Sequence, residues 1–132
     1  MRIVCIGKPG TDYADKIKLY TQRVSHYRPI DIIYARNTEK ARNALRDSYI
    51  VLVDASGKQR DSQAFALWLG EHLRDIAFVI GEAEGLPKEI RDLANESVSL
   101  SKMTFPHQMA RLMLIEQIYR AMTILNNHPY NK

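Results

Sequence analysis

The 132-residue chain has a single cysteine, Cys5, and no apolar run near the roughly 20 residues that a membrane-spanning helix requires. A disulfide within the chain is therefore excluded. A lone thiol in the apolar run Ile3–Ile6 indicates a reduced, buried strand position, which favours a cytoplasmic protein that contacts no membrane. Gly7 and Lys8 follow too soon for the apolar core of a secretion signal. With 45% apolar and 26% charged residues, we expect one globular domain over 1–132.

Several common catalytic motifs are also absent. No G-x-G-x-x-G follows an apolar run that predicts a strand, so the sequence offers no dinucleotide-binding loop of that type. The pair Gly57-Lys58 lacks the earlier glycine of a phosphate-binding P-loop, and no G-x-S-x-G nucleophile elbow is present. One cysteine and four widely separated histidines give no zinc-ligand spacing, so we expect no metal.

Charge is unevenly distributed along the chain. The formal net charge is +4, with ten Lys and Arg against five Asp and Glu in residues 1–50, and nine against ten in residues 51–132. A basic N-terminal half suits a phosphate-rich partner. A solvated surface with a chance surplus of basic residues explains the charge equally well.

The hydrophobic pattern alternates between strand and helix. Short apolar runs predict strands at Arg2–Gly7, Ile30–Ala35, Tyr49–Val53, Ile76–Ile80 and Val98–Leu100. Apolar residues spaced three and four apart predict helices at 12–27, 38–47, 62–73, 87–94 and 106–125, the first capped by Thr11 or Asp12. This order is typical of an α/β fold, with a mainly parallel sheet and helices on both faces. Ligands bind outside the carboxyl ends of such strands, so binding loops are expected after Val53, Ile80 and Leu100.

Two loops follow these strands closely. Residues 81–85 begin and end with glycine, which lets backbone approach a ligand because no side chain is in the way. Taken alone, this loop is better explained as a plain strand-to-helix turn. Residues Asp54–Lys58 are also predicted to form a turn.

The predicted last helix, 106–125, is apolar almost all round. Its clustered polar positions are Glu116, Arg120 and Thr123. Such a helix must be buried on most sides. One sheet in so small a chain is not expected to cover it, so we expect a second copy to do so in a homodimer. Burial within one subunit is the alternative.

Three C-terminal stretches identify a protein family more specifically than the general α/β pattern does. These are Phe78–Leu86, Ser99–Arg111, and Glu116–Ala121 with Asn127–Tyr130. Together they resemble the bacterial large-subunit ribosomal RNA methyltransferases of the SPOUT superfamily, which methylate N3 of a pseudouridine in 23S ribosomal RNA. The resemblance covers residues 49–132 closely and the first 48 in pattern. It implies a C-terminal trefoil knot and a homodimer.

The resemblance also implies S-adenosyl-L-methionine as methyl donor and the assembled ribosome as substrate. By position, the family's cofactor contacts fall on Val53, Gly81, Leu100, Ser101, Lys102, Met103, Thr104 and Phe105. The family's usual Gly-Gly-Pro-Glu-Gly loop is here Gly-Glu-Ala-Glu-Gly at 81–85. Glu82 and Ala83 therefore change the methionine end of the expected pocket.

Methyl transfer from a sulfonium needs few catalytic side chains, because the methyl group is already activated. The enzyme aligns the reacting atoms and helps the N3 proton to leave. We expect His128, Tyr130 and Arg120 to be the catalytic residues that serve these two tasks. A helix pair between Glu116 and Arg120 is a structural alternative. RNA contacts are expected from His107, Arg23, Arg28, Arg42 and Arg46, the arginines binding phosphates.

Two other functions are consistent with the sequence. One is a knotted dimer that binds RNA or cofactor but has lost methyl transfer through the altered 81–85 loop. The other is a methyltransferase that acts on another RNA, such as tRNA. Measuring cofactor binding tests the first, and mapping the methylated nucleotide tests the second.

Overall fold

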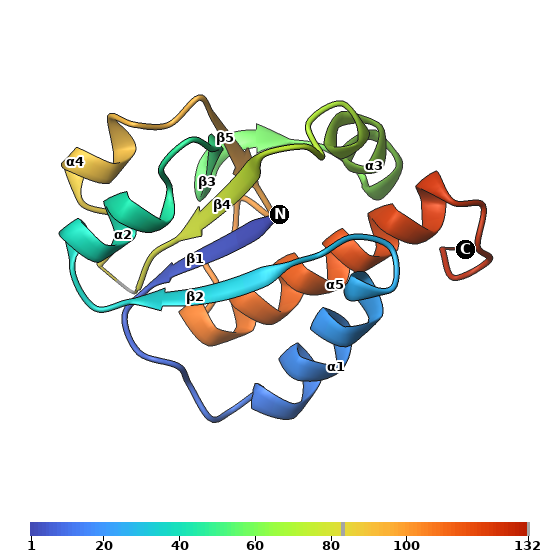
Figure 1. Cartoon of the computed structure of the whole chain (residues 1–132), viewed down its shortest axis with the longest axis horizontal. Coiled ribbons are helices and arrows are strands. Elements are labelled where there is room, and N and C mark those ends of the chain that lie inside the picture. Colours follow the sequence, from blue (N-terminus) through green and yellow to red (C-terminus); the bar gives the residue numbers. More distant parts are fainter. Residues whose placement is uncertain (83, 132) are drawn as a thin grey trace.

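The computed structural model describes residues 1–82 and 84–131 and has one five-stranded sheet (Figure 1). Its strands are β1 (Arg2–Ile6), β2 (Asp31–Ala35), β3 (Tyr49–Gln59), β4 (Ile76–Ile80) and β5 (Glu96–Ser99). Neighbouring strands pair in parallel, in the order β2-β1-β4-β3-β5. The predicted α/β class with a mainly parallel sheet is confirmed.

Helices cover both faces of the sheet, and they are α1 (Ala14–Ser25), α2 (Thr38–Ala44), α3 (Ser62–Gly70), α4 (Lys88–Arg91) and α5 (His107–Leu125). On one face α5 packs against α1 and α3, and on the other α2 packs against α4 (Figure 1). Successive β1 side chains alternate between the two cores, with Ile3 and Cys5 toward α5 and Val4 toward α2. Cys5 is buried as predicted, and burial raises the pKa of its thiol to about 11.

The predicted turn at Asp54–Lys58 is wrong, because β3 continues through it to Gln59. After a register shift, the last two residues of β3 lie opposite Val98 and Ser99 of β5. Gly57 permits this close approach, since a Cβ there would lie 2.7 Å from the carbonyl carbon of Val98. The glycine that favoured a turn in the sequence therefore serves strand pairing.

The N-terminus of α1 lacks the predicted side-chain cap. Its N-cap residue is Tyr13, which makes no capping hydrogen bond through its side chain, and Thr11 and Asp12 precede it. The backbone N–H of Asp12 instead donates to Oε1 of Gln108 at 3.2 Å. A contact with α5 thus takes the place of a local cap.

The first four predicted helices extend beyond their observed ends. After α2 and α3 the chain tightens into turns in which the Arg46 N–H donates to the Asn43 carbonyl and the His72 N–H to the Leu69 carbonyl. The apolar period continues through such turns, so the pattern overestimates helix length. The predicted fifth strand also ends earlier, at Ser99.

The expected burial of the last helix is confirmed, and one chain provides part of it. No residue of α5 is exposed, because α1 and α3 flank it. Thr123, assigned to a polar stripe, is fully buried and donates its hydroxyl to the Arg120 carbonyl at 2.6 Å. One chain therefore covers part of this helix, and its other residues are only partly buried, so the expected second copy stays a prediction. Among the helices in residues 1–82 and 84–131, none has the length and apolar content needed to cross a membrane.

A half-buried cluster joins the first residues of β3 and β5 to α3. The Glu96 carboxylate accepts hydrogen bonds from the Tyr49 hydroxyl and, at 3.1 Å, from Nε1 of Trp68. Arg60 lies 3.5 Å from it, and His72 stacks on Tyr49 with ring centroids 4.4 Å apart. Burial alone would raise the pKa of Glu96, but these hydrogen bonds and the Arg60 charge lower it overall. The carboxylate therefore stabilises this edge of the sheet in its charged form.

We expect Glu96→Gln to lower the free energy of unfolding by about 1–3 kcal/mol, because a neutral amide replaces a charged acceptor shared by half-buried donors. A lowered folded-state pKa means that this stabilisation is fully present above the unfolded value of 4.5 and is lost as the pH falls through the folded value. Urea unfolding of both proteins from neutral to acid pH measures it.

Glu89→Gln is the matched control, because the Glu89 side chain is 67% exposed and its ion pair with Arg42 is long, at 3.6 Å. We expect it to change stability by less than about 0.5 kcal/mol. If the difference in free energy of unfolding between wild type and Glu96→Gln stayed constant into acid pH, it would contradict the charged role of Glu96.

Candidate functional site

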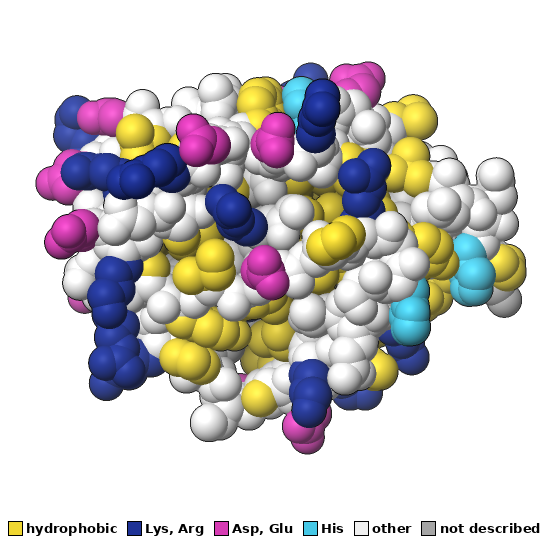
Figure 2. Space-filling model, in the orientation of Figure 1, with side chains coloured by type: hydrophobic (Ala, Val, Ile, Leu, Met, Phe, Trp, Pro, Cys, Tyr) yellow, Lys and Arg dark blue, Asp and Glu magenta, His cyan; other side chains and the backbone are white. Residues whose placement is uncertain are grey.

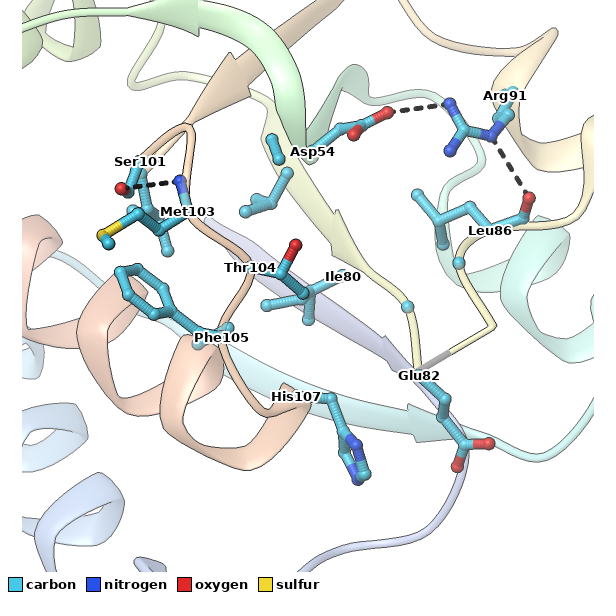
Figure 3. A pocket seen from close by; sticks show the side chains of 16 residues that line it. Asp54, Ile80, Glu82, Leu86, Arg91, Ser101, Met103, Thr104, Phe105 and His107 are labelled. Atoms are coloured by element: carbon cyan, nitrogen blue, oxygen red, sulfur yellow. Dashed lines mark hydrogen bonds and ion pairs between the residues drawn. The ribbon is translucent and has the colours of Figure 1, made fainter.

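A cavity of about 240 Å³ opens at the carboxyl end of β4, beside the middle of β3 and beyond β5, where ligands bind in open parallel sheets. Its walls come from the residues after Val53, from the ends of the 80–86 segment and from the 100–105 loop, and the start of α5 closes one side (Figure 3). Ala83 lies outside the described residues. In the described part of the chain, no three His, Cys, Asp or Glu side chains converge as metal ligands.

Most residues expected to contact the cofactor line this cavity, and they are Val53, Gly81, Leu100, Ser101, Met103, Thr104 and Phe105. Lys102 is exposed and is not part of the lining. The structure thus brings together, from three loops, positions that are far apart in the sequence.

Glycines shape the wall that follows β4. A Cβ on Gly81 would lie 3.0 Å from the backbone of Gly85 and 3.2 Å from Cδ2 of Leu86. Gly85 has a φ of +83°, and its N–H donates to the Glu82 carbonyl at 2.9 Å. The two ends of this loop therefore lie against each other, and bare backbone faces the cavity.

The opposite wall is held by its own serines. The Ser99 hydroxyl donates to the Ser101 carbonyl at 2.8 Å, and the Met103 N–H donates to the Ser101 hydroxyl at 3.0 Å. The Met103 side chain is 74% exposed. Local hydrogen bonds therefore fix the shape of the 100–105 loop, and a large apolar side chain projects from it.

An ion pair that the sequence did not indicate crosses the cavity wall. Nη1 of Arg91 lies 2.8 Å from Oδ2 of Asp54, and Nε of Arg91 donates to the Leu86 carbonyl at 3.2 Å (Figure 3). Burial alone would raise the pKa of Asp54, but hydrogen bonds from Arg91 and from the Ser56 N–H lower it overall. The carboxylate is therefore charged and neutralised. The position of Asp54 directly after the apolar run of β3 was the signal available in the sequence.

Arg111 is a second functional candidate that sequence reasoning missed. It is only 3% exposed, and its Nη1 donates to the Lys8 carbonyl at 3.1 Å. The guanidinium also lies 5.3 Å from the ring centroid of Tyr34. Arg111 follows cavity-lining Ala110, so with Gln108 it fixes the β1–α1 loop beside the cavity.

The C-terminal tail docks on α5 through a separate cluster. Arg120 donates to Glu116 Oε1 from Nε and Nη2 at 3.0 and 2.6 Å, and to Asn131 Oδ1 from Nη1 at 3.1 Å. Its guanidinium lies 4.8 Å from the ring centroid of Tyr130, whose hydroxyl donates to Glu116 at 3.2 Å. The helix pair considered as an alternative for Arg120 is therefore present, and Glu116 also binds the tail.

Both candidate groups in this cluster hold their protons tightly. The hydrogen bond to Glu116 raises the pKa of Arg120. Burial, a hydrogen bond with Tyr20 and the charge of Glu116 raise the pKa of Tyr130. His128 is exposed, and it follows Asn127, whose φ of +57° ends the helix and lets the His128 N–H donate to the Thr123 carbonyl at 2.9 Å.

The cavity lies at the start of α5, where His107 and Ala110 line it, and the tail lies at the other end of this helix (Figure 1). This helix has 19 residues, so its ends are roughly 27 Å apart at about 1.5 Å per residue. One chain therefore collects most of the expected cofactor contacts but does not bring His128, Tyr130 and Arg120 to them.

The residues expected to bind RNA do not share one surface. Arg23 and Arg28 lie on or just after α1, whereas Arg42 and Arg46 lie on or just after α2, across the sheet. His107 lines the cavity instead. On the face drawn in Figure 2, basic side chains are mixed with acidic ones rather than forming one continuous patch. The basic N-terminal half is therefore divided between two faces.

The fold is an α/β fold whose cavity lies at the carboxyl end of its central strand β4, the place where parallel sheets bind ligands. Residues 1–131 match the family described as predicted SPOUT methyltransferases. The chain belongs to this family, and the resemblance seen in the sequence is confirmed.

Curated relatives agree over the whole chain. The ribosomal RNA large subunit methyltransferase H of Gemmatimonas aurantiaca is 38% identical over 150 residues, covering 98% of this chain and 97% of that protein. The protein of the same name from Coprothermobacter proteolyticus is 35% identical over 137 residues, covering 100% and 99%.

Solved structures share the fold. A probable methylase family protein from Haemophilus influenzae superposes with a TM-score of 0.60 at 15% identity, over 99% of this chain and 70% of that one. The SpoU methyltransferase AviRb from Streptomyces viridochromogenes, solved in complex with AdoMet, gives 0.57 at 13% identity, over 96% and 61%.

We expect Glu116→Gln to release the tail, because the amide is a weaker acceptor for Arg120 and Tyr130 than the carboxylate. Carboxypeptidase should then remove the C-terminal residues through Tyr130 from the native variant roughly five- to tenfold faster, as followed by mass spectrometry. This factor corresponds to a loss of about 1–1.4 kcal/mol in the free energy that holds the tail on α5. Glu39→Gln, an exposed glutamate on α2, is the control. Equal digestion rates for both variants would show that Glu116 does not hold the tail.

Proposed function

We propose that this protein transfers a methyl group from S-adenosyl-L-methionine to N3 of a pseudouridine in 23S ribosomal RNA of the assembled ribosome. The observation that carries the proposal is the cavity, which is lined by seven of the eight residues expected to contact the cofactor. The chain's membership of the SPOUT methyltransferases and the names of its relatives support the reaction and the class of RNA. A relative in fold binds AdoMet.

The cavity fits the adenosine part of this cofactor. Apolar side chains of Leu86, Leu100 and Phe105 offer surfaces for a planar base, and the missing side chain of Gly81 lets Gly85 and Leu86 lie close against it in this wall. Backbone groups of the 81–85 and 100–105 loops would hold the base edge and the ribose. When bound, S-adenosyl-L-methionine supplies a methyl carbon already activated by the adjacent sulfonium.

A trefoil knot and a homodimer belong to this proposal, with residues 1–132 forming one domain. Membership of the SPOUT methyltransferases supports the knot. Leu112 on α5 is only partly buried and Met103 is exposed, which suits a second copy. The roughly 27 Å between cavity and tail gives a stronger reason, because a tail from the partner subunit would supply the residues that one chain keeps away.

The three tail residues would then divide the work on the target base. Arg120 and Tyr130 keep their protons, so they would orient the base and stabilise negative charge as N3 is deprotonated. His128 is exposed, and imidazole is the usual side-chain base near neutral pH, so it would accept the N3 proton. Alignment of N3 with the methyl carbon remains the main contribution.

RNA binding would use both faces of the protein. Arg23, Arg28, Arg42 and Arg46 would bind phosphates, and His107 would contact RNA at the rim of the cavity. Two separated basic regions suit a large folded RNA surface in the cytoplasm, such as the ribosome, better than a short duplex.

We expect purified protein to transfer label from labelled S-adenosyl-L-methionine to ribosomes that lack the modification, with the label mapping to a pseudouridine of 23S RNA by mass spectrometry. Gly81→Val is the matched control, because its side chain would press on the backbone of Gly85 and on Leu86 and so deform this wall of the cavity. It should bind cofactor at least about tenfold more weakly and transfer no label.

Other outcomes identify the alternatives. Cofactor binding without transfer to any RNA would favour a knotted binding protein. Label on tRNA or another RNA would favour a different methyltransferase, and absence of cofactor binding by the wild type would overturn the proposal.

A mixing experiment tests whether the site is shared between subunits. We expect Gly81→Val and His128→Ala to be inactive alone, each at under about 5% of wild-type activity. Unfolded and refolded together, mixed dimers would carry one intact site, and activity should return to about a quarter of the wild-type value. Recovery requires two subunits, because neither variant holds both intact parts. If the mixture stays inactive while mixed dimers form, the site lies within one chain.

A further inference from the structure

We propose that the Glu82 carboxylate recognises the α-ammonium group at the amino-acid end of the cofactor. The inference rests on the proposed function, since it needs S-adenosyl-L-methionine in the cavity. Glu82 would then be a specificity-determining residue that recognises the charged amino-acid end of the cofactor.

The charges around the cavity single out this carboxylate. Two carboxylates line it, those of Asp54 and Glu82. Asp54 is neutralised by Arg91 at 2.8 Å. Among the ion pairs of residues 1–82 and 84–131, none involves Glu82. The cavity therefore offers an approaching ligand one uncompensated negative charge.

The Glu82 side chain is exposed at the rim of the cavity and lies over Gly7. Gly7, at the end of β1, has a φ of +115°, and a Cβ on it would lie only 1.8 Å from Oε1 of Glu82. The Glu82 side chain thus occupies the space that any other residue at position 7 would take. Figure 3 shows it below β4 at the rim, on the side of His107 and away from the Asp54–Arg91 pair.

The shape of the ligand matches this division of the cavity. The apolar side chains of Leu86, Leu100 and Phe105 suit the adenine, whereas the amino-acid end is charged and needs a polar, partly hydrated rim. An ammonium beside an unpaired carboxylate is favourable, and a hydrogen bond between two charged groups is stronger than one between neutral groups. The sulfonium is also cationic, so the test has to separate the two charges.

Three ligands distinguish the ammonium charge from the sulfonium charge, and their binding is measured by calorimetry at low salt. S-adenosyl-L-methionine carries the ammonium and the sulfonium, S-adenosylhomocysteine carries the ammonium alone, and methylthioadenosine carries neither. For Glu82→Gln we expect about tenfold weaker binding of the first two and unchanged binding of methylthioadenosine. Glu84→Gln is the matched control, because Glu84 is an exposed glutamate of the same loop that does not line the cavity.

The outcomes distinguish this inference from the proposed function. Weaker binding of S-adenosyl-L-methionine alone would assign Glu82 to the sulfonium and overturn the inference. Equal effects of Glu82→Gln and Glu84→Gln would also overturn it, as a general charge effect. Weaker binding of all three ligands would mean a reshaped pocket rather than ammonium recognition. If the wild type binds none of them, the proposed function itself fails.

Discussion

The structure depends on the burial of one long helix. α5 fills the space between α1 and α3 against the sheet, and its side chains Leu114, Ile115 and Ile118 are fully buried. Its first turn closes the cavity and fixes the β1–α1 loop through Gln108 and Arg111. Its last turns carry the cluster that anchors the tail. Packing of this helix therefore sets the positions of two functional regions at once.

Much of the fold could be predicted from local pattern, because buried parallel strands are short apolar runs and the helices between them follow a period near four. The errors occur where distant parts of the chain decide. β3 continues past Val53 because β5 accepts it, and α1 starts without a cap because Gln108 serves its preceding loop. Nothing local in the sequence at Thr11 or Gly57 announces those partners.

The candidate site divides in the same way. Gly81 and the 100–105 loop follow strands, and Val53 ends the apolar run of β3, so strand prediction together with the family resemblance located them. The Asp54–Arg91 pair and the buried Arg111 were missed, since each depends on a contact between segments far apart in sequence. The tail residues were found by motif. Their distance from the cavity, however, is a property of helix length that no motif contains.

Helix length has a further consequence for the evolution of this chain. Adding one residue to α5 would turn everything after it by about 100° and move it by about 1.5 Å. If the extra residue lay after Tyr119, the tail would lose the contacts of Tyr130 with Glu116 and Tyr119; if it lay before Glu116, this whole cluster would turn relative to the cavity end. Loops elsewhere can lengthen without such an effect. The length of the helix from His107 to Leu125 therefore fixes the distance and angle between the cavity and the tail. Insertions are expected to accumulate outside this helix.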